Sequence, residues 1–252
     1  MRLQMKVELV SYQYRKTEAK RLAYTAEIIN RSSADIILFA GHTLLYSKSI
    51  AELSKLIRNK RSYAFIETRE SDEELNHPYL VAKGKIVDLK THQFFVYSSE
   101  IKKDITLGLK YLDELETKRI VKIGSRRCLL VQCGEINILK NHQTEGNRAS
   151  FRFDDDSEMR SRFEKILSSV DIVLNPMHSL MGNQGKLARR RELFSRDGRL
   201  YFSTCNADAK HKNLRAKSMQ YAYQNGIPLC AEMTLAEDGG YISRVFTVDD
   251  VC

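Results

Sequence analysis

The sequence predicts an α/β fold built on a mixed sheet. Short apolar runs typical of buried strands alternate with segments whose apolar residues recur at helical spacing. Some neighbouring strands are separated by only two residues, one of them glycine, which indicates hairpins. Helices between strands favour parallel pairing and hairpins give antiparallel pairing, so the two patterns together predict a sheet of both kinds.

Two helices and five strands are expected in the amino-terminal half. The first helix shows the pattern plainly, since Leu22, Ala26 and Ile29 recur on one face. Lys83 and Gly84 lie between two strands and predict a tight hairpin turn. The expected helices cover residues 17–31 and 49–59, and the expected strands cover residues 3–10, 35–39, 63–68, 79–82 and 85–89.

The carboxy-terminal half continues the alternation. Gly124 and Ser125 mark another hairpin, Ser157 is suited to cap a helix, and Pro176 is expected to stop a strand. The expected strands cover residues 119–123, 128–132, 171–176, 200–205, 229–234 and 241–248, the last two joined around residues 237–240. The expected helices cover residues 157–169 and 186–195, and residues 98–110, 141–156 and 178–186 are expected to be loops that shape a pocket.

Length and composition favour one domain over residues 1–252. The chain has 252 residues, of which 42% are hydrophobic, and that is enough for one large core. Only three prolines occur, and no Gly/Ser-rich run suggests a linker. No apolar stretch approaches the ~20 residues that a membrane span needs. The first ten residues alternate charge and apolarity, unlike a signal peptide, so a cytoplasmic protein is expected.

The cysteines predict reduced thiols. Five are present, at positions 128, 133, 205, 230 and 252, an odd number at irregular spacing. No close Cys or Cys-His pair has the spacing of a zinc site. The pattern fits the reducing cytosol, and no metal is expected.

The net charge of +9 raises the question of a nucleic-acid partner. The densest basic stretches are residues 186–191 and 210–217. Neither has interleaved aromatic residues that could stack on bases. A solvated helix face and an ordinary loop are the favoured interpretations, and docking on nucleic acid or an acidic partner is a weaker alternative.

Residues 128–139 carry the most informative pattern. Leu129, Leu130 and Val131 form an apolar run typical of a strand buried on both faces, and Cys133 follows at its carboxyl end. Loops at the carboxyl ends of strands form the crevice of open α/β sheets. A thiol there is either a nucleophile or, as most free cysteines are, a small buried hydrophobe.

Five segments in order make the chain resemble the nitrilase, or carbon-nitrogen hydrolase, superfamily. The matching segments are residues 34–39 (ADIILF), 84–92 (GKIVDLKTH), 129–135 (LLVQCGE), 170–176 (VDIVLNP) and 189–206. The resemblance covers nearly the whole chain. It implies a four-layer αββα sandwich with a Glu-Lys-Cys triad. Here it implies Cys133 as nucleophile and Lys90 as the lysine.

The chain departs from the family at the catalytic glutamate. Where the family has Phe-Pro-Glu, this chain has Phe39, Ala40 and Gly41. Glycine has no side chain that can accept a proton. His42, Glu100 or Glu135 could supply the base instead, or hydrolysis could have been lost.

These residues define a candidate site. Cys133 would attack a carbonyl carbon, Lys90 and a backbone N–H near Gly134 would face the oxyanion, and His42 or Glu100 would act as base. The remaining candidates are placed by the resemblance or by their position at strand ends. Gly41, Glu135 and His178 are expected at the pocket, with no role assigned to His178.

The resemblance leads to two functional hypotheses. The first is amidase-type thiol chemistry on a small amide or related C–N bond. The alternative is a catalytically inactive nitrilase-fold module, a pseudoenzyme that binds a small molecule or protein partner. The resemblance implies no metal or organic cofactor, and it implies a homodimer paired through outer helices.

Overall fold

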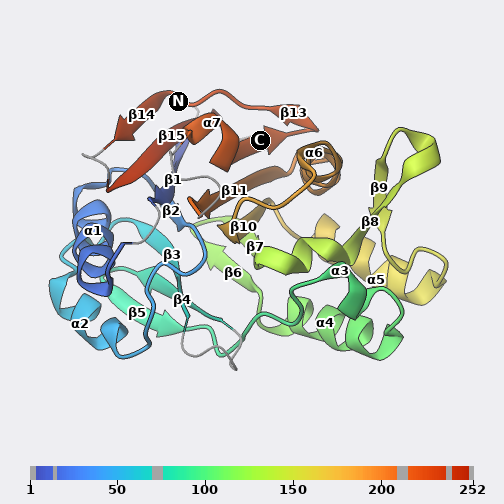
Figure 1. Ribbon diagram of the computed structural model, residues 1–252, viewed down its shortest axis with the longest axis horizontal. Coiled ribbons are helices and arrows are strands. Elements are labelled where there is room, and N and C mark those ends of the chain that lie inside the picture. Colours follow the sequence, from blue (N-terminus) through green and yellow to red (C-terminus); the bar gives the residue numbers. More distant parts are fainter. Residues whose placement is uncertain (1–3, 14–15, 70–75, 209–214, 237–239, 250–252) are drawn as a thin grey trace.

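Two mixed sheets pack face to face and carry helices on their outer faces (Figure 1). The computed structural model describes residues 4–13, 16–69, 76–208, 215–236 and 240–249. The first sheet runs in the order β14 (Met233–Ala236), β15 (Tyr241–Asp249), β1 (Gln4–Tyr12), β2 (Ile36–Phe39), β3 (Tyr63–Thr68), β4 (His77–Ala82) and β5 (Lys85–Asp88). The second runs in the order β13 (Ile227–Pro228), β12 (Gln220–Gln224), β11 (Leu200–Asn206), β10 (Ile172–Ser179), β7 (Arg126–Leu130) and β6 (Ile120–Ile123).

Parallel pairs form the middle of each sheet. β1, β2 and β3 are parallel neighbours in the first sheet, and β7, β10 and β11 are parallel neighbours in the second. The described pairs at the edges are antiparallel, as the hairpins predicted. Strands 35–39, 129–132 and 172–174 were expected to be buried, and all their residues except the exposed Asp35 are buried in the structure.

Three layers of apolar side chains hold the four structural layers together. Between the sheets, Leu9 and Leu38 of the first pack with Leu174 of the second. The outer face of the first sheet packs against α1 (Glu18–Arg31) and α2 (Ser49–Leu56). The outer face of the second packs against α4 (Ile105–Thr117), α5 (Ser157–Ser168) and α6 (Gln184–Phe194). The expected αββα sandwich is confirmed.

Two segments expected to be loops are ordered elements. Residues 98–110 contain α3 (Ser98–Ile101) and the start of α4, whose buried residues Tyr111, Leu112 and Leu115 recur at helical spacing. Residues 141–156 contain a hairpin of β8 (Leu139–His142) and β9 (Arg148–Phe151), with the 3₁₀ turn η2 (Gln143–Glu145) between them.

Two expected boundaries also differ. β10 continues through Pro176, because proline removes one N–H donor while its fixed φ still suits an extended chain. The cap of α5 is Asp156, not Ser157, and its carboxylate accepts from the N–H groups of Glu158 and Met159.

The basic run of residues 186–191 is not simply a solvated face. Arg190 is buried and donates to the side chains of Asn141 and Asn137. Arg191 is buried with its guanidinium 3.6 Å from the ring centroid of Tyr221. These two charges therefore hold α6 to its neighbours. The second basic run, residues 210–217, lies largely outside the described residues.

The described cysteines are all free. Cys128, Cys133 and Cys205 are buried and Cys230 is exposed, while Cys252 lies outside the described residues. Among the helices of the described segments, none has the length and apolarity to cross a membrane.

Candidate functional site

Four strand ends from the two sheets meet at one edge of the sandwich. His42 follows β2 and Glu67 lies near the end of β3, both in the first sheet. Cys133 follows β7 and opens the 3₁₀ helix η1 (Cys133–Ile138), and His178 lies near the end of β10, both in the second sheet. The carboxyl ends of parallel strands lie on one edge, so each sheet brings its pair of side chains there.

Cys133, His178 and Glu67 form a connected set. The Nε2 atom of His178 lies 2.7 Å from Oε1 of Glu67. The backbone N–H of His178 donates to Sγ of Cys133 at 3.3 Å. The thiol and the carboxylate are almost fully buried, whereas 16% of the His178 side chain is exposed. His178 therefore contacts a buried thiol through its backbone and a buried carboxylate through its ring.

The electrostatics favour an ion pair between His178 and Glu67. Burial works against charge on both groups, but their mutual attraction outweighs it. The carboxylate of Glu67 and the contact with Cys133 raise the pKa of His178 well above its ordinary value. The positive charge and hydrogen bond of His178 lower the pKa of Glu67 to about 2. At neutral pH the pair is imidazolium and carboxylate.

Further donors hold the Glu67 carboxylate in place. The backbone N–H of His42 donates to Oε1 at 2.9 Å, and Nε2 of Gln132 donates to Oε2 at 2.6 Å. Gln132 directly precedes the thiol and is itself buried. Its own Oε1 is buried without a hydrogen-bond partner among the described residues. Glu67 is thus fixed by both sheets.

His42 stacks on His178. The two ring centroids are 3.7 Å apart and the planes differ by 12°. His42 has a left-handed backbone with φ of 55°, a region that histidine enters more readily than most residues. Its Nε2 lies 2.9 Å from Oδ1 of Asn76. Burial and the neighbouring positive His178 lower the pKa of His42 to about 4, so this ring is neutral at pH 7.

Gly41 makes the position of His178 possible. A Cβ atom on Gly41 would lie 2.3 Å from Cδ2 of His178 and 3.0 Å from Oε1 of Glu67. Real Cβ atoms do not approach other atoms that closely, so the ring occupies the space that a side chain at position 41 would need. The space beside Gly41 is therefore occupied by an imidazole and a carboxylate.

Lys90 and Glu100, two expected catalytic residues, make no hydrogen bond or ion pair with Cys133, His178 or Glu67 among the described contacts. Lys90 is exposed with φ of 51°, and its side chain makes no hydrogen bond or ion pair with any described residue. Glu100 is exposed, and its carboxylate accepts the backbone N–H groups of Val96 and Tyr97 at the start of α3. That carboxylate is engaged in capping a helix.

Gly134 and Glu135 support the thiol from behind. A Cβ on Gly134 would lie 2.2 Å from the carbonyl oxygen of Val96, so only glycine allows this close approach. Glu135 is fully buried and ion-paired with buried Arg119 at 2.9 Å. Burial raises the pKa of Glu135, and Arg119 and two backbone N–H groups oppose that effect. One of those N–H groups belongs to Gln132, so Glu135 fixes the turn that carries Cys133.

Glu67, Asn76 and Gln132 escaped the sequence analysis. Residues 63–68 were correctly expected to form a strand, and Glu67 was available as a carboxylate inside an apolar run. A buried charge in such a run requires a partner, which was the usable signal. The partner lies 111 positions away in sequence, in the other sheet, so sequence spacing did not reveal it.

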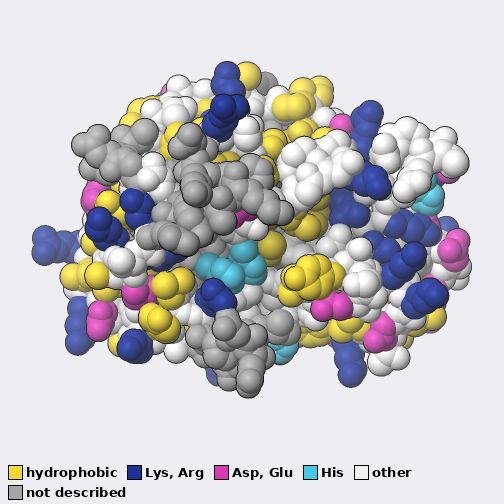
Figure 2. All heavy atoms as spheres, in the orientation of Figure 1, with side chains coloured by type: hydrophobic (Ala, Val, Ile, Leu, Met, Phe, Trp, Pro, Cys, Tyr) yellow, Lys and Arg dark blue, Asp and Glu magenta, His cyan; other side chains and the backbone are white. Residues whose placement is uncertain are grey.

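Histidine side chains gather in one patch near the middle of the face shown in Figure 2. His42 and His178 are both partly exposed, whereas Glu67 and Cys133 are buried. Part of each histidine is therefore reached by solvent. One ring nitrogen of each histidine and a carboxylate oxygen of Glu67 lie within 4.8 Å of one another, a spacing that could hold a metal ion.

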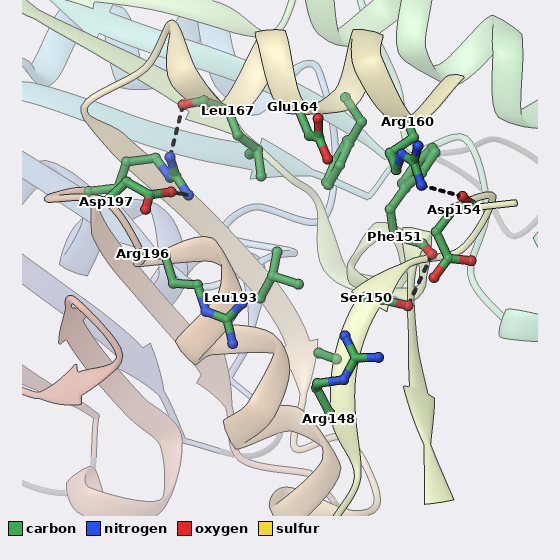
Figure 3. A pocket seen from close by; sticks show the side chains of 13 residues that line it. Arg148, Ser150, Phe151, Asp154, Arg160, Glu164, Leu167, Leu193, Arg196 and Asp197 are labelled. Carbon is green, nitrogen blue, oxygen red and sulfur yellow. Dashed lines mark hydrogen bonds and ion pairs between the residues drawn. The ribbon is translucent and has the colours of Figure 1, made fainter. Parts of the chain in front are cut away.

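A separate cavity of about 410 Å³ lies between α5, α6 and the β8–β9 hairpin (Figure 3). Phe151, Phe163 and Leu193 contribute apolar surface, and charged side chains surround them. The charges are largely balanced, since Arg199 is paired with Asp197 and Arg148 with Glu145. No thiol or histidine is among the residues that line this cavity.

Comparison with solved structures gives a uniform result. A CN-hydrolase superfamily protein from Xanthomonas campestris, with an arsenic adduct in its active site, matches at TM-score 0.57 and 9% identity over 98% of this chain and 90% of the other. An amidase from Nesterenkonia sp. AN1, captured as a mutant whose active-site cysteine carries an acetamide moiety from fluoroacetamide, matches at TM-score 0.58 and 12% identity over 96% and 90%.

A carbon-nitrogen hydrolase from Helicobacter pylori G27 matches at TM-score 0.54 and 9% identity over 96% of this chain and 88% of the other. No family model matches the sequence, and a search of curated proteins found no match. At such low identities, the likeness to these structures shows a shared fold.

Proposed function

We propose that this chain, which has the fold of the carbon-nitrogen hydrolase superfamily, is a thiol hydrolase of small amides. Cys133 is the nucleophile and His178 is the base. Glu67 orients His178 and stabilises its protonated form. The observation that carries the proposal is the position of His178, whose ring nitrogen lies 2.7 Å from Glu67 and whose backbone N–H donates to Cys133 Sγ. A nucleophile, a base and a group that orients the base make up a complete set for acyl transfer.

The first half of the reaction forms a thioester. Sγ of Cys133 attacks the amide carbonyl carbon as a thiolate, with its proton held on His178. Backbone N–H groups at the start of η1, near Gly134, face the developing oxyanion. The tetrahedral intermediate collapses, the C–N bond breaks, and His178 passes its proton to the departing amine.

The second half releases the acid. His178, now neutral, takes a proton from a water molecule, which attacks the thioester carbon. The C–S bond breaks and Cys133 leaves as a thiolate beside the re-formed imidazolium. Glu67 accepts from Nε2 of His178 throughout, so Nδ1 is the nitrogen that exchanges protons.

The proposal moves the base from His42 and Glu100 to His178. His42 remains neutral against His178 and orients it by stacking. Small primary amides are the proposed substrates, because the amidase that shares the fold carries an acetamide moiety on its active-site cysteine.

The test is turnover of a panel of short-chain amides by the full chain. Turnover by the wild type, with complete loss in Cys133→Ala and loss of roughly 10³-fold or more in His178→Asn, supports the proposal. Absence of turnover across the panel, with Cys133 still alkylated, favours the inactive binding module. Turnover that survives His178→Asn contradicts the assignment of the base.

A homodimer is a separate proposal that rests on the family resemblance. Exposed hydrophobic residues on the described surface include Ile105 and Leu109 of α4 on the outer layer. Sedimentation of the full chain at micromolar concentration tests it. A dimer that Leu109→Glu dissociates supports pairing through this layer, and a monomer refutes it.

A further inference from the structure

We infer that His42, Glu67 and His178 form a site for a divalent transition-metal ion of the zinc class, and that the ion inhibits the thiol chemistry. Binding itself is independent of the proposed function. The inhibition rests on the proposed function, because it requires His178 to act as the base.

The donor set carries the inference. Two imidazole nitrogens and one carboxylate oxygen lie within 4.8 Å of one another. Two histidines and one glutamate are a known protein ligand set for zinc, with a fourth position left for water or another ligand. Imidazole nitrogen binds zinc, copper, iron and nickel, whereas magnesium and calcium prefer sites made of oxygen atoms.

The surroundings already do part of what a metal site requires. Oε2 of Glu67 accepts from Gln132 at 2.6 Å, which fixes the carboxylate. Such second contacts to a ligand typically support metal affinity. Nε2 of His42 lies 2.9 Å from Oδ1 of Asn76, a contact of the kind that orients ligating histidines.

Binding requires one main movement and the release of the proton that His178 shares with Glu67. Zinc–nitrogen bonds are about 2.0–2.1 Å, so tetrahedral ligand atoms stand about 3.3 Å apart, and Nε2 of His178 and Oε1 of Glu67, now 2.7 Å apart, must separate slightly. The lone pairs lie in the ring planes, and the two rings are parallel to within 12°. His42 must therefore rotate out of the stack, which its partial exposure allows. His178 and Glu67 are already in contact and need to move little.

Inhibition follows from the same atoms. An ion on His178 replaces the hydrogen bond between its ring nitrogen and Glu67, and so leaves the imidazole without a free lone pair once its other nitrogen carries hydrogen. The base then cannot exchange a proton with Cys133. Cys133 itself is not one of the three ligands, so its thiol stays outside the proposed coordination.

The experiment measures Zn²⁺ binding to the full chain by calorimetry in a non-chelating buffer, with Co²⁺ as a spectroscopic probe. The variants are His42→Ala, His42→Gln and Glu67→Gln, each checked for an unchanged circular dichroism spectrum. His92→Ala is the matched control, because His92 is exposed and its ring lies 6.3 Å from that of His77, forming a second histidine pair. Cys133→Ser tests for capture by the thiol.

Binding of one equivalent of Zn²⁺ by the wild type supports the site. The affinity should fall at least tenfold in His42→Ala, His42→Gln and Glu67→Gln. It should be unchanged in His92→Ala and Cys133→Ser. Visible Co²⁺ bands without sulfur-to-cobalt charge transfer support the nitrogen and oxygen ligand set. Binding lost in His92→Ala, binding lost in Cys133→Ser, or no binding at all overturns the inference.

The two proposals fail separately. Zn²⁺ binding with the expected variant pattern but no amide turnover leaves the metal site standing and refutes the hydrolase. Amide turnover by a chain that binds no Zn²⁺ leaves the hydrolase standing and refutes the metal site. If both are present, Zn²⁺ must inhibit turnover with the same affinity that calorimetry gives, and a chelator must reverse it.

Discussion

A side-chain carbon on Gly41 would lie 2.3 Å from Cδ2 of His178, so the two positions cannot both carry full side chains in this arrangement. The glycine at position 41 is thereby tied to the imidazole that fills its space. Glu67, from the neighbouring strand β3, supplies the carboxylate that contacts this imidazole.

Gly41→Ala is expected to displace His178 and impair the site. Because the new methyl group must push the ring away from Glu67, alkylation of Cys133 by iodoacetamide at neutral pH should slow several-fold and amide turnover should fall. Gly41→Glu should not restore activity, since it needs still more space. Gly182→Ala is the matched control, because a Cβ there meets nothing within 4 Å. Equal effects of the two alanine substitutions would contradict this account.

Glu67→Gln is expected to cost roughly 10³–10⁴-fold in turnover, as removal of the orienting carboxylate does in comparable triads. The amide keeps the size of the side chain but loses the charge that raises the pKa of His178. That pKa should therefore fall, and proton NMR of the imidazole can follow it. An unchanged His178 titration in Glu67→Gln would show that Glu67 does not raise the pKa of this ring.

Lys90→Met is expected to leave both Cys133 alkylation and turnover within about twofold of the wild type. The Lys90 side chain is exposed and has no partner among the described residues. Substitutions of that kind usually change little. A large loss of turnover in this variant would mean that Lys90 reaches the thiol after all, as the family resemblance implied.

The stability of the fold is expected to decrease as the pH falls from 6.5 to 4. Burial lowers the pKa of His42 to about 4, whereas the unfolded chain binds the proton near 6.5. The contribution of neutral His42 to the free energy of unfolding is fully present above pH 6.5 and is lost by pH 4, with a maximum of about 3 kcal/mol. His178 has the opposite shift and contributes outside this window.

Urea denaturation at a series of pH values measures this contribution. His42→Gln should flatten the dependence between pH 6.5 and 4 relative to the wild type, and His77→Gln serves as the control. Parallel curves for the wild type and His42→Gln would remove His42 as the source. A chelator in the buffer keeps metal ions from complicating the comparison.

Glu135→Gln is expected to destabilise the protein by roughly 3–5 kcal/mol, because it leaves the buried guanidinium of Arg119 without its counter-charge. The loss is in folding and in the shape of the Cys133 turn, since Glu135 also accepts from Gln132 N–H. Denaturant midpoints measure it. Glu145→Gln, which breaks an exposed pair with Arg148, is the matched control and should leave the denaturant midpoint nearly unchanged.

The sequence was most informative where local pattern decides structure. The strand at residues 63–68 was located to the residue, and the buried strands before Cys133 and at residues 171–176 were correctly placed. The helix beginning at Ile105 was missed although its apolar residues recur at helical spacing. The helical spacing of those residues is itself sufficient to predict a helix there.

The candidate site was only partly predictable, because its contacts run between sheets. Cys133, His42, Gly41 and His178 were all identified, since each stands at the end of an apolar strand run. The meeting of Glu67 with His178 depends on how two sheets pack, which alternation along one strand does not encode. Lys90 was expected from the resemblance, but the left-handed turn beside Asp88 leaves it exposed.

Because the site is divided between two sheets, its residues can meet only when both sheets are formed and correctly packed. Glu67 belongs to one sheet, and Cys133 and His178 to the other, so the 2.7 Å contact joins separate halves of the molecule. A slip of one residue along a strand moves side chains by about 3.3 Å and turns them to the opposite face. A compact chain with every strand formed but its halves misregistered would bury a thiol and a carboxylate that never meet. Such a chain would not carry out the proposed thiol reaction, even if its secondary structure content were unchanged.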